Sequence, residues 1–190
     1  KNANLQSLST REGMPDITAW VSATSLSNGE QYKARALIAD PTVEELRLAG
    51  TEYPAWVNER YLHVPTEIAP QLRELALQIT ASHETVYDKA QAITTYLRDE
   101  IEYRKTIEES PPPDRDPVLW VLFEYKKGFC MYYASAETLM LRSIGIPARM
   151  TVGFVEGEYD EMEEKYTVVY EDSHAWPEVY FPGVGWVEFE

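Results

Sequence analysis

The sequence contains one cysteine, Cys130, at the start of an apolar run of helical character. The run follows Gly128-Phe129 and ends at residues 144–147, where Gly145 and Pro147 stop a helix. A thiol in the first turn of a helix lies near the positive end of the dipole, which favours the thiolate. The unpaired backbone N–H groups there can also hold an oxyanion. A lone free cysteine is more often a small buried residue, so a nucleophile assignment requires a base.

His174 is the candidate base among three histidines. It lies in residues 173–180, a segment rich in strand-forming residues. Alternation along the strand puts His174 and Trp176 on one face and Ala175 on the other. A strand histidine placed beside a cysteine at a helix start can take the proton of the thiol. The other two histidines lie in an irregular segment and before a helix, where surface or packing roles are expected.

A carboxylate is also needed, because the imidazole must be held in one tautomer. Glu188 and Glu190 fall on the same face of the last predicted strand, which we expect to pair with the strand bearing His174. Either glutamate could serve. Asp172 is less suitable, since side chains two residues apart on one strand point in parallel.

Apolar periodicity and turn signals predict the elements that position these residues. The predicted helices span 43–49, 68–80, 85–101, 117–123 and 130–144, and the predicted strands span 17–25, 31–38, 149–155, 165–171, 173–181 and 186–190. Asn28-Gly29 predicts a hairpin turn between the first two strands. Helices followed by antiparallel strands indicate an α+β fold and not alternating βαβ units. We expect residues 1–64, a hairpin with an irregular extension, to pack on a core of residues 65–190.

Composition limits the partners, disulfides and metal sites that the chain can have. The 190 residues contain 17 Lys and Arg against 32 Asp and Glu, a net charge of −15, which argues against nucleic acid as a partner. A single cysteine cannot form an intramolecular disulfide. Residues 156–164 hold six acids but lack the ordered alternation and central glycine of a calcium loop, so a solvated hairpin tip is expected there. No metal or other cofactor is predicted.

Three segments in order resemble the Cys, His and Asp motifs of the transglutaminase core, a papain-like superfamily. They are Gly128-Phe129-Cys130, Ser173-His174-Ala175-Trp176 and Gly185-Trp186-Val187-Glu188-Phe189-Glu190. The segment Arg142–Arg149 resembles the one that follows the family's cysteine helix. Tyr53-Pro54-Ala55-Trp56, Tyr61-Leu62 and Asp116-Pro117-Val118 resemble the bacterial membrane-anchored branch. The resemblance runs from about Gln31 to Glu190.

The resemblance implies a papain-like fold with the nucleophile helix packed on an antiparallel sheet. Cys130 is then the nucleophile, His174 the base, and Glu190 stands where the family has Asp. The implied reaction is attack on a glutamine carboxamide of a protein or peptide, loss of ammonia, and transfer of the thioester to an amine or water. It also implies an extracytoplasmic domain of a bacterial membrane-anchored protein.

Three questions stay open at the level of the sequence. A papain-like hydrolase, a peptidase or deamidase, would use the same triad with water as acceptor. A non-catalytic binding module could retain the same fold. The second oxyanion donor is also open, with Tyr103 and Trp120 as aromatic candidates.

Overall fold

The computed structural model describes residues 5–9, 16–22, 27–33 and 40–190. It divides into two compact units, Lys1–Ile38 and Ala39–Glu190. Within the described ranges, no helix combines the length and apolar character that crossing a membrane requires.

The first unit contains a two-stranded antiparallel sheet, in which β1 (Leu5–Ser9) pairs with β2 (Ile17–Ser22). The predicted hairpin partner of this strand, residues 31–38, falls mostly on residues 34–38, which lie outside the described residues, while residues 31–33 form no strand.

The predicted turn itself forms, since the Glu30 amide donates to the Ser27 carbonyl at 3.1 Å. Asn-Gly favours such a tight turn, and Gly29 has the positive φ, 82°, that glycine adopts readily.

The second unit holds six α-helices and seven strands. The helices are α1 (Val43–Leu48), α2 (Ala55–Tyr61), α3 (Ala69–Ile79), α4 (Val86–Glu100), α5 (Pro117–Trp120), which continues as a π-helical turn (Val121–Tyr125), and α6 (Cys130–Ser143). The strands are β3 (Glu102–Tyr103), β4 (Lys127–Gly128), β5 (Ala148–Phe154), β6 (Glu158–Asp160), β7 (Lys165–Thr167), β8 (Ser173–Phe181) and β9 (Gly185–Glu188).

α2 corrects the prediction of an irregular segment over 53–65. Pro54 directly precedes the helix, and Val57 and Tyr61, four residues apart, form its buried face. The Tyr61 ring packs edge-on against Trp186 of β9 with centroids 4.6 Å apart. Aromatic packing against a strand distant in sequence thus accompanies a helix that local signals did not predict.

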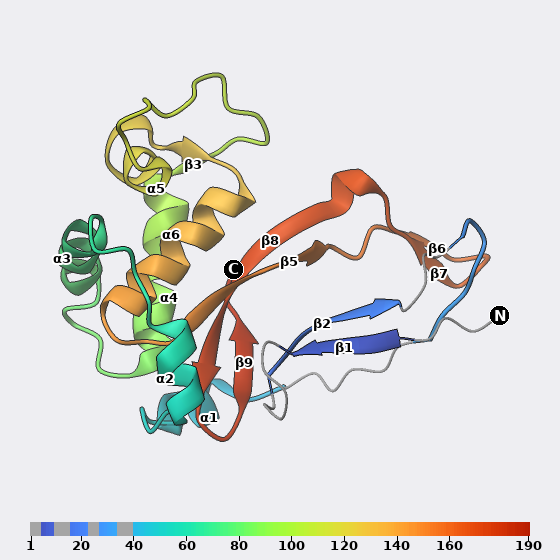
Figure 1. The fold of residues 1–190 in the computed structure, drawn as a ribbon, viewed down its shortest axis with the longest axis horizontal. Helices are drawn as coiled ribbons and strands as arrows, with labels where there is room; N and C mark the ends of the chain where they lie inside the picture. The colour runs from blue at the N-terminus through green and yellow to red at the C-terminus, as the bar shows by residue number, and fades with distance from the viewer. Residues whose placement is uncertain (1–4, 10–15, 23–26, 34–39) are drawn as a thin grey trace. The chain divides into compact units, whose positions relative to one another are not determined.

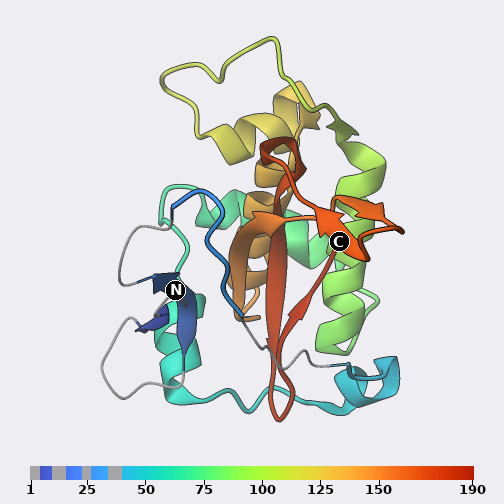
Figure 2. The ribbon, with the colours of Figure 1, turned by 90° about the vertical axis from the view of Figure 1, so that its right-hand side faces the viewer.

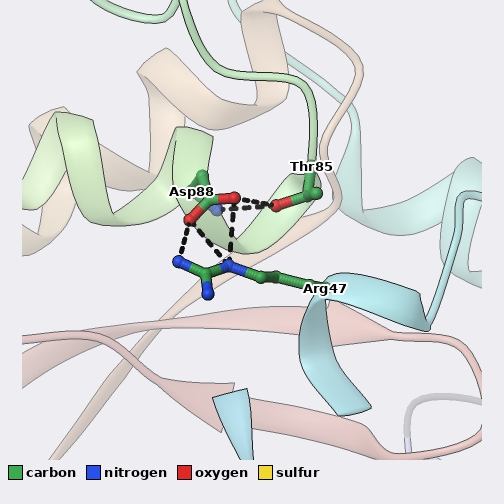
Figure 3. A network of polar contacts seen from close by, with 3 residues as sticks. All are labelled: Arg47, Thr85 and Asp88. Carbon is green, nitrogen blue, oxygen red and sulfur yellow. Dashed lines mark hydrogen bonds and ion pairs between the residues drawn. The ribbon is translucent and has the colours of Figure 1, made fainter. Parts of the chain in front are cut away.

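A polar network connects α1 to α4 (Figure 3). Thr85 caps α4 by accepting the Asp88 amide at 3.1 Å, as the Thr-x-x-Asp pattern predicts. The Asp88 carboxylate also accepts hydrogen bonds from two guanidinium nitrogens of Arg47 in α1, at 2.8 and 3.0 Å. The residues before Pro65 therefore belong structurally with those after it.

The two compact units of the structure meet between Ile38 and Ala39. Leu46 of α1 lies in the same hydrophobic core as Leu97 of α4 and Val179 of β8. A separate core beginning at Pro65 stays a prediction.

The sheet that carries the site is antiparallel, in the order β5-β8-β9. α6 packs on β5 and β8 with one side and on α3 and α4 with the other (Figures 1 and 2). On β8, residues Ala175, Pro177, Val179 and Phe181 are buried, while the alternate residues are half-buried. The predicted α+β, papain-like fold with the cysteine helix on an antiparallel sheet is confirmed.

Candidate active site

Cys130 is the first residue of α6 and is half-buried. The preceding residue, Phe129, provides no side-chain cap, so the first-turn N–H groups of the helix lack that partner. Gly128 leaves room for the side chain of Tyr132 in the first turn of the helix, because a Cβ at position 128 would lie 3.0 Å from the Cβ of Tyr132. The predicted position of the thiol at a helix start is therefore observed.

Tyr103 lies beside Cys130. The parallel pairing of β3 with β4 sets Tyr103 opposite Gly128, and the Arg104 amide donates to the Gly128 carbonyl at 2.8 Å. Burial raises the pKa of Tyr103, and a hydrogen bond with the backbone of Cys130 lowers it in part. The Tyr103 hydroxyl thus lies at the end of the helix where an oxyanion would form.

Trp120 is not at the site. It is 5% exposed, lies in the hydrophobic core and stacks on Tyr125 with ring centroids 4.2 Å apart. Of the two aromatic candidates for the second oxyanion donor, the fold brings only Tyr103 to the thiol.

His174 is positioned by β8 and its neighbour β5, where Gly153 lies opposite. The imidazole stacks on Trp176 with centroids 6.1 Å apart and an interplanar angle of 24°. A Cβ on Gly153 would lie 2.8 Å from Cη2 of Trp176, closer than real contacts allow. A glycine on the neighbouring strand therefore makes room for the indole on which His174 stacks.

The pairing of β8 with β9 brings Glu190 to His174. Phe189 continues the ladder by donating its amide to the Pro177 carbonyl at 3.0 Å, which puts Glu190 on the His174 face of the sheet. Nε2 of His174 lies 2.5 Å from Oε1 of Glu190. The His174 side chain is 16% exposed and that of Glu190 is 60% exposed.

The other two carboxylates considered lie elsewhere. Glu188 falls opposite Glu178, and Glu178 accepts a hydrogen bond from Arg149 at 2.6 Å. Asp172 accepts the Val169 amide at 2.8 Å, in a 3₁₀ turn before β8.

Cys130 and His174 line the walls of two cavities together. The larger, about 430 Å³, also includes Phe129, Val152 and Gly153. The smaller, about 280 Å³, also includes Glu190. When the Nε2–H of a neutral imidazole donates to Glu190, the lone pair lies on Nδ1 and is available to a thiol proton. The arrangement can therefore provide a nucleophile, a base and a carboxylate that fixes the tautomer.

Sequence reasoning missed Glu137, which lines the smaller cavity with Thr94. Burial raises the pKa of Glu137 to about 8. A glutamate seven residues after Cys130, in a largely apolar stretch of one helix, was the available signal.

The acidic segment forms a hairpin of β6 with β7, as expected, and residues 158–171 are exposed. Oδ1 of Asp160 accepts the backbone amides of Met162 and Glu163 at 2.9 and 3.1 Å. Within the described ranges, no three His, Cys, Asp or Glu residues are grouped so that they could hold a metal ion.

A cysteine at the start of a helix, with a histidine and a glutamate on an adjoining antiparallel sheet, is the layout of a papain-like cysteine enzyme. Residues 73–190 match the model of the transglutaminase-like superfamily, and the chain belongs to that superfamily.

Relatives agree with this assignment. The uncharacterized protein YebA of Bacillus subtilis is 39% identical over 138 residues, which are 70% of this chain and 19% of YebA. A protein-glutamine gamma-glutamyltransferase of Pseudomonas aeruginosa is 27% identical over a 194-residue alignment, 93% of this chain and 28% of that protein. The chain thus spans under a third of the length of either curated relative.

A solved structure has the same fold. The periplasmic domain of TgpA from Pseudomonas aeruginosa superposes with a TM-score of 0.63 at 28% identity. The match covers 74% of this chain and 48% of that domain.

Proposed function

We propose that this chain catalyses cysteine-dependent acyl transfer of the transglutaminase type. The observation that carries the proposal is the short contact between His174 and Glu190 in a cavity wall shared with Cys130. Membership of the transglutaminase-like superfamily supports it, as does the glutamyltransferase among the relatives.

In the first half-reaction, the Cys130 thiol gives its proton to Nδ1 of His174 and the sulfur attacks the carboxamide carbon of a substrate glutamine. The hydroxyl of Tyr103, which a hydrogen bond with the Cys130 backbone holds at the start of the helix, stabilises the oxyanion. The imidazolium returns the proton to the leaving nitrogen, ammonia departs and a thioester remains. Glu190 holds the imidazole tautomer and stabilises its positive charge.

In the second half-reaction, a primary amine attacks the thioester carbonyl and gives a proton to His174. The tetrahedral intermediate expels the Cys130 sulfur, which recovers the proton. The products are a substituted amide and the free enzyme. Water in place of the amine gives glutamate, which is the hydrolase alternative.

Incorporation of a fluorescent primary amine into a glutamine-rich protein tests the proposal. We expect amine uptake that requires Cys130, with Cys130→Ala as the matched inactive variant. Ammonia release without amine uptake would assign the hydrolase instead. If neither amine uptake nor ammonia release is observed, the result would favour a non-catalytic binding module.

We also propose that the chain is an extracytoplasmic domain of a membrane-anchored bacterial protein that acts on protein or peptide substrates. The periplasmic location of the TgpA domain supports this placement. Protease accessibility of the domain in intact cells or spheroplasts, set against a cytoplasmic marker, tests it.

A further inference from the structure

A groove in the second unit lies between α3 and α5, and both helices pack on α6. Its volume is about 560 Å³, within the range of about 300–1,000 Å³ that ligand-binding clefts have. The two helices, the π-helical turn and the residues before each helix line it, whereas Cys130, His174 and Glu190 line the smaller cavity of the site. The proposed reaction therefore gives this groove no role.

The apolar lining of the groove is continuous with the hydrophobic core. Ile68 belongs to that core, and Leu75 of α3 and Leu119 of α5 pack against it. Phe123 of the π-helical turn also lines the groove, and it is 45% exposed. A partner side chain that covers the Phe123 ring and Leu75 removes apolar area from water, which favours a complex. The groove thus offers a partner an exposed aromatic ring beside side chains that the core holds in place.

The charged lining of the groove is acidic. Arg115 is the cation of this lining, and it pairs with Glu124 at 3.5 Å. Asp116 caps α5 by accepting the amides of Val118 and Leu119 at 2.9 and 3.2 Å. The remaining carboxylates, which are exposed and have no ion pair within the described part of the chain, are Glu67, Glu74 and Asp114. Uncompensated negative charge therefore lies beside the apolar lining.

These charges favour a cationic occupant. Carboxylates of like charge repel one another, and cationic side chains placed among them relieve the repulsion. An arginine can pair with a carboxylate through two parallel hydrogen bonds, and it can also stack on the Phe123 ring. A second copy of this chain carries a net charge of −15 and is repelled. Charge complementarity thus favours a basic partner over self-association.

We propose that the groove between α3 and α5 docks a basic segment of a protein partner. An apolar side chain of the segment packs on Phe123 and Leu75. The arginines or lysines on either side of it pair with Glu67, Glu74 and Asp114. The docked segment lies outside the two cavities that Cys130 lines, so its binding does not depend on acyl transfer.

Fluorescence anisotropy of a labelled peptide measures docking. The probe is nine residues long, with four arginines around a central pair of leucines and a blocked N-terminus. It contains neither lysine nor glutamine, so it offers the proposed enzyme no acceptor amine and no donor carboxamide. We expect saturable binding that weakens as salt is added, because ions screen exposed charge pairs.

Two altered peptides separate the charged contacts from the apolar ones. Uncharged citrulline in place of the arginines should weaken binding at least about fivefold, since each exposed ion pair contributes modestly. Serine in place of the leucines should weaken it by a similar factor, because less apolar area is covered. A citrulline or serine peptide that binds as tightly as the probe overturns the proposal.

Charge-neutral variants of the protein locate the docking surface. Glu67→Gln combined with Glu74→Gln should weaken binding at least about threefold. The matched control, Glu158→Gln combined with Glu161→Gln, removes the same charge from the exposed hairpin of β6 and β7 and should leave binding nearly unchanged. An equal loss in both double variants, or no loss in either, overturns the proposal.

Phe123→Ala tests the apolar contact. It should weaken binding of the leucine peptide by a larger factor than binding of the serine peptide, since the double-mutant cycle isolates the contact between the two side chains. Leu48→Ala is the control, because it shortens an exposed apolar side chain outside the groove. Weakening of the two peptides by the same factor overturns the proposal.

Two measurements on the unmutated protein separate the groove from the catalytic site. Saturating peptide should protect the backbone amides of residues 67–78 and 114–124 from hydrogen exchange and leave the alkylation rate of Cys130 unchanged. Slower alkylation with protection around Cys130 would assign the peptide to the catalytic cavities and overturn the proposal. Dimerisation that Phe123→Ala abolishes, measured by sedimentation, would assign the groove to a second copy of this chain and overturn it as well.

Discussion

Nε2 of His174 and Oε1 of Glu190 lie 2.5 Å apart, and the antiparallel register of β8 and β9 brings them together. A carboxylate acceptor makes a hydrogen bond from the imidazole a charge-assisted one. With Nε2 engaged, Nδ1 is the nitrogen available to the Cys130 thiol. The catalytic roles of these three residues are predictions that follow from this geometry and from the family.

Glu190→Gln should lower kcat/KM for amine incorporation by at least about tenfold, because the amide can hold the wrong tautomer and cannot stabilise the imidazolium. Glu190→Asp should retain more activity. Glu188→Gln is the matched control, since Glu188 lies opposite Glu178 and away from His174. Steady-state kinetics of the three variants check this, and an effect of Glu188→Gln as large as that of Glu190→Gln would contradict the assignment.

Cys130 should react with iodoacetamide faster than free cysteine below about pH 7, because His174 can take the thiol proton as the sulfur attacks. His174→Ala should remove most of this advantage. His83→Ala, which changes a histidine that lines neither cavity with Cys130, is the control. Mass spectrometry of the labelled protein over time measures the rate. A rate equal to that of free cysteine would contradict the assignment of Cys130 as an activated nucleophile.

Gly153→Ala should displace Trp176 and, through it, the stacked imidazole of His174. Activity should fall, and overpacking should lower the free energy of unfolding by about 1–3 kcal/mol. Trp176→Phe supplies the missing space, so the double variant should regain stability relative to Gly153→Ala alone. Urea unfolding measures the difference, and additive losses in the double variant would show that the two side chains do not compete for space.

Glu137 should make stability fall with rising pH. Its pKa is about 8 in the fold, raised by burial from an ordinary value of 4.5, so unfolding releases a proton between these values. The free energy of unfolding therefore falls as pH rises from about 4.5 to about 8 and then levels off. Thermal unfolding across this range should show a smaller decline for Glu137→Gln than for the unmutated protein. Glu161→Gln should decline as the unmutated protein does.

Asp88 should have the opposite pH dependence: its contribution to the free energy of unfolding should be lost as pH falls. Hydrogen bonds from Arg47 and then Thr85 hold its pKa below the ordinary value of 3.8 (Figure 3). The contribution is present above that value and is lost as pH falls through the folded-state pKa. Asp88→Asn should lower the Tm near neutral pH, and the difference should narrow in acid. Asp114→Asn, in an exposed loop, should show neither effect.

Much of the fold could be predicted from local signals. The caps at Thr42 and Thr85, the apolar stripe of α4 and the stop after α6 all depend on residues within a few positions of one another. Alternation along β8 likewise predicts which residues share a face with His174. α2 was not predicted in this way, because its buried face packs against residues distant in sequence, among them Trp186 of β9.

The sequence by itself determined that a thiol opens a helix, that a histidine follows on a strand, and that glutamates come later on a pairing strand. Helical and strand periodicities are local, and they orient each side chain within its own element. The tertiary structure brought Glu190 to His174 and Tyr103 to Cys130, and it placed Glu137 in the wall of a cavity with Cys130. Register and burial are relations between elements far apart in sequence, so only the packed fold determines them.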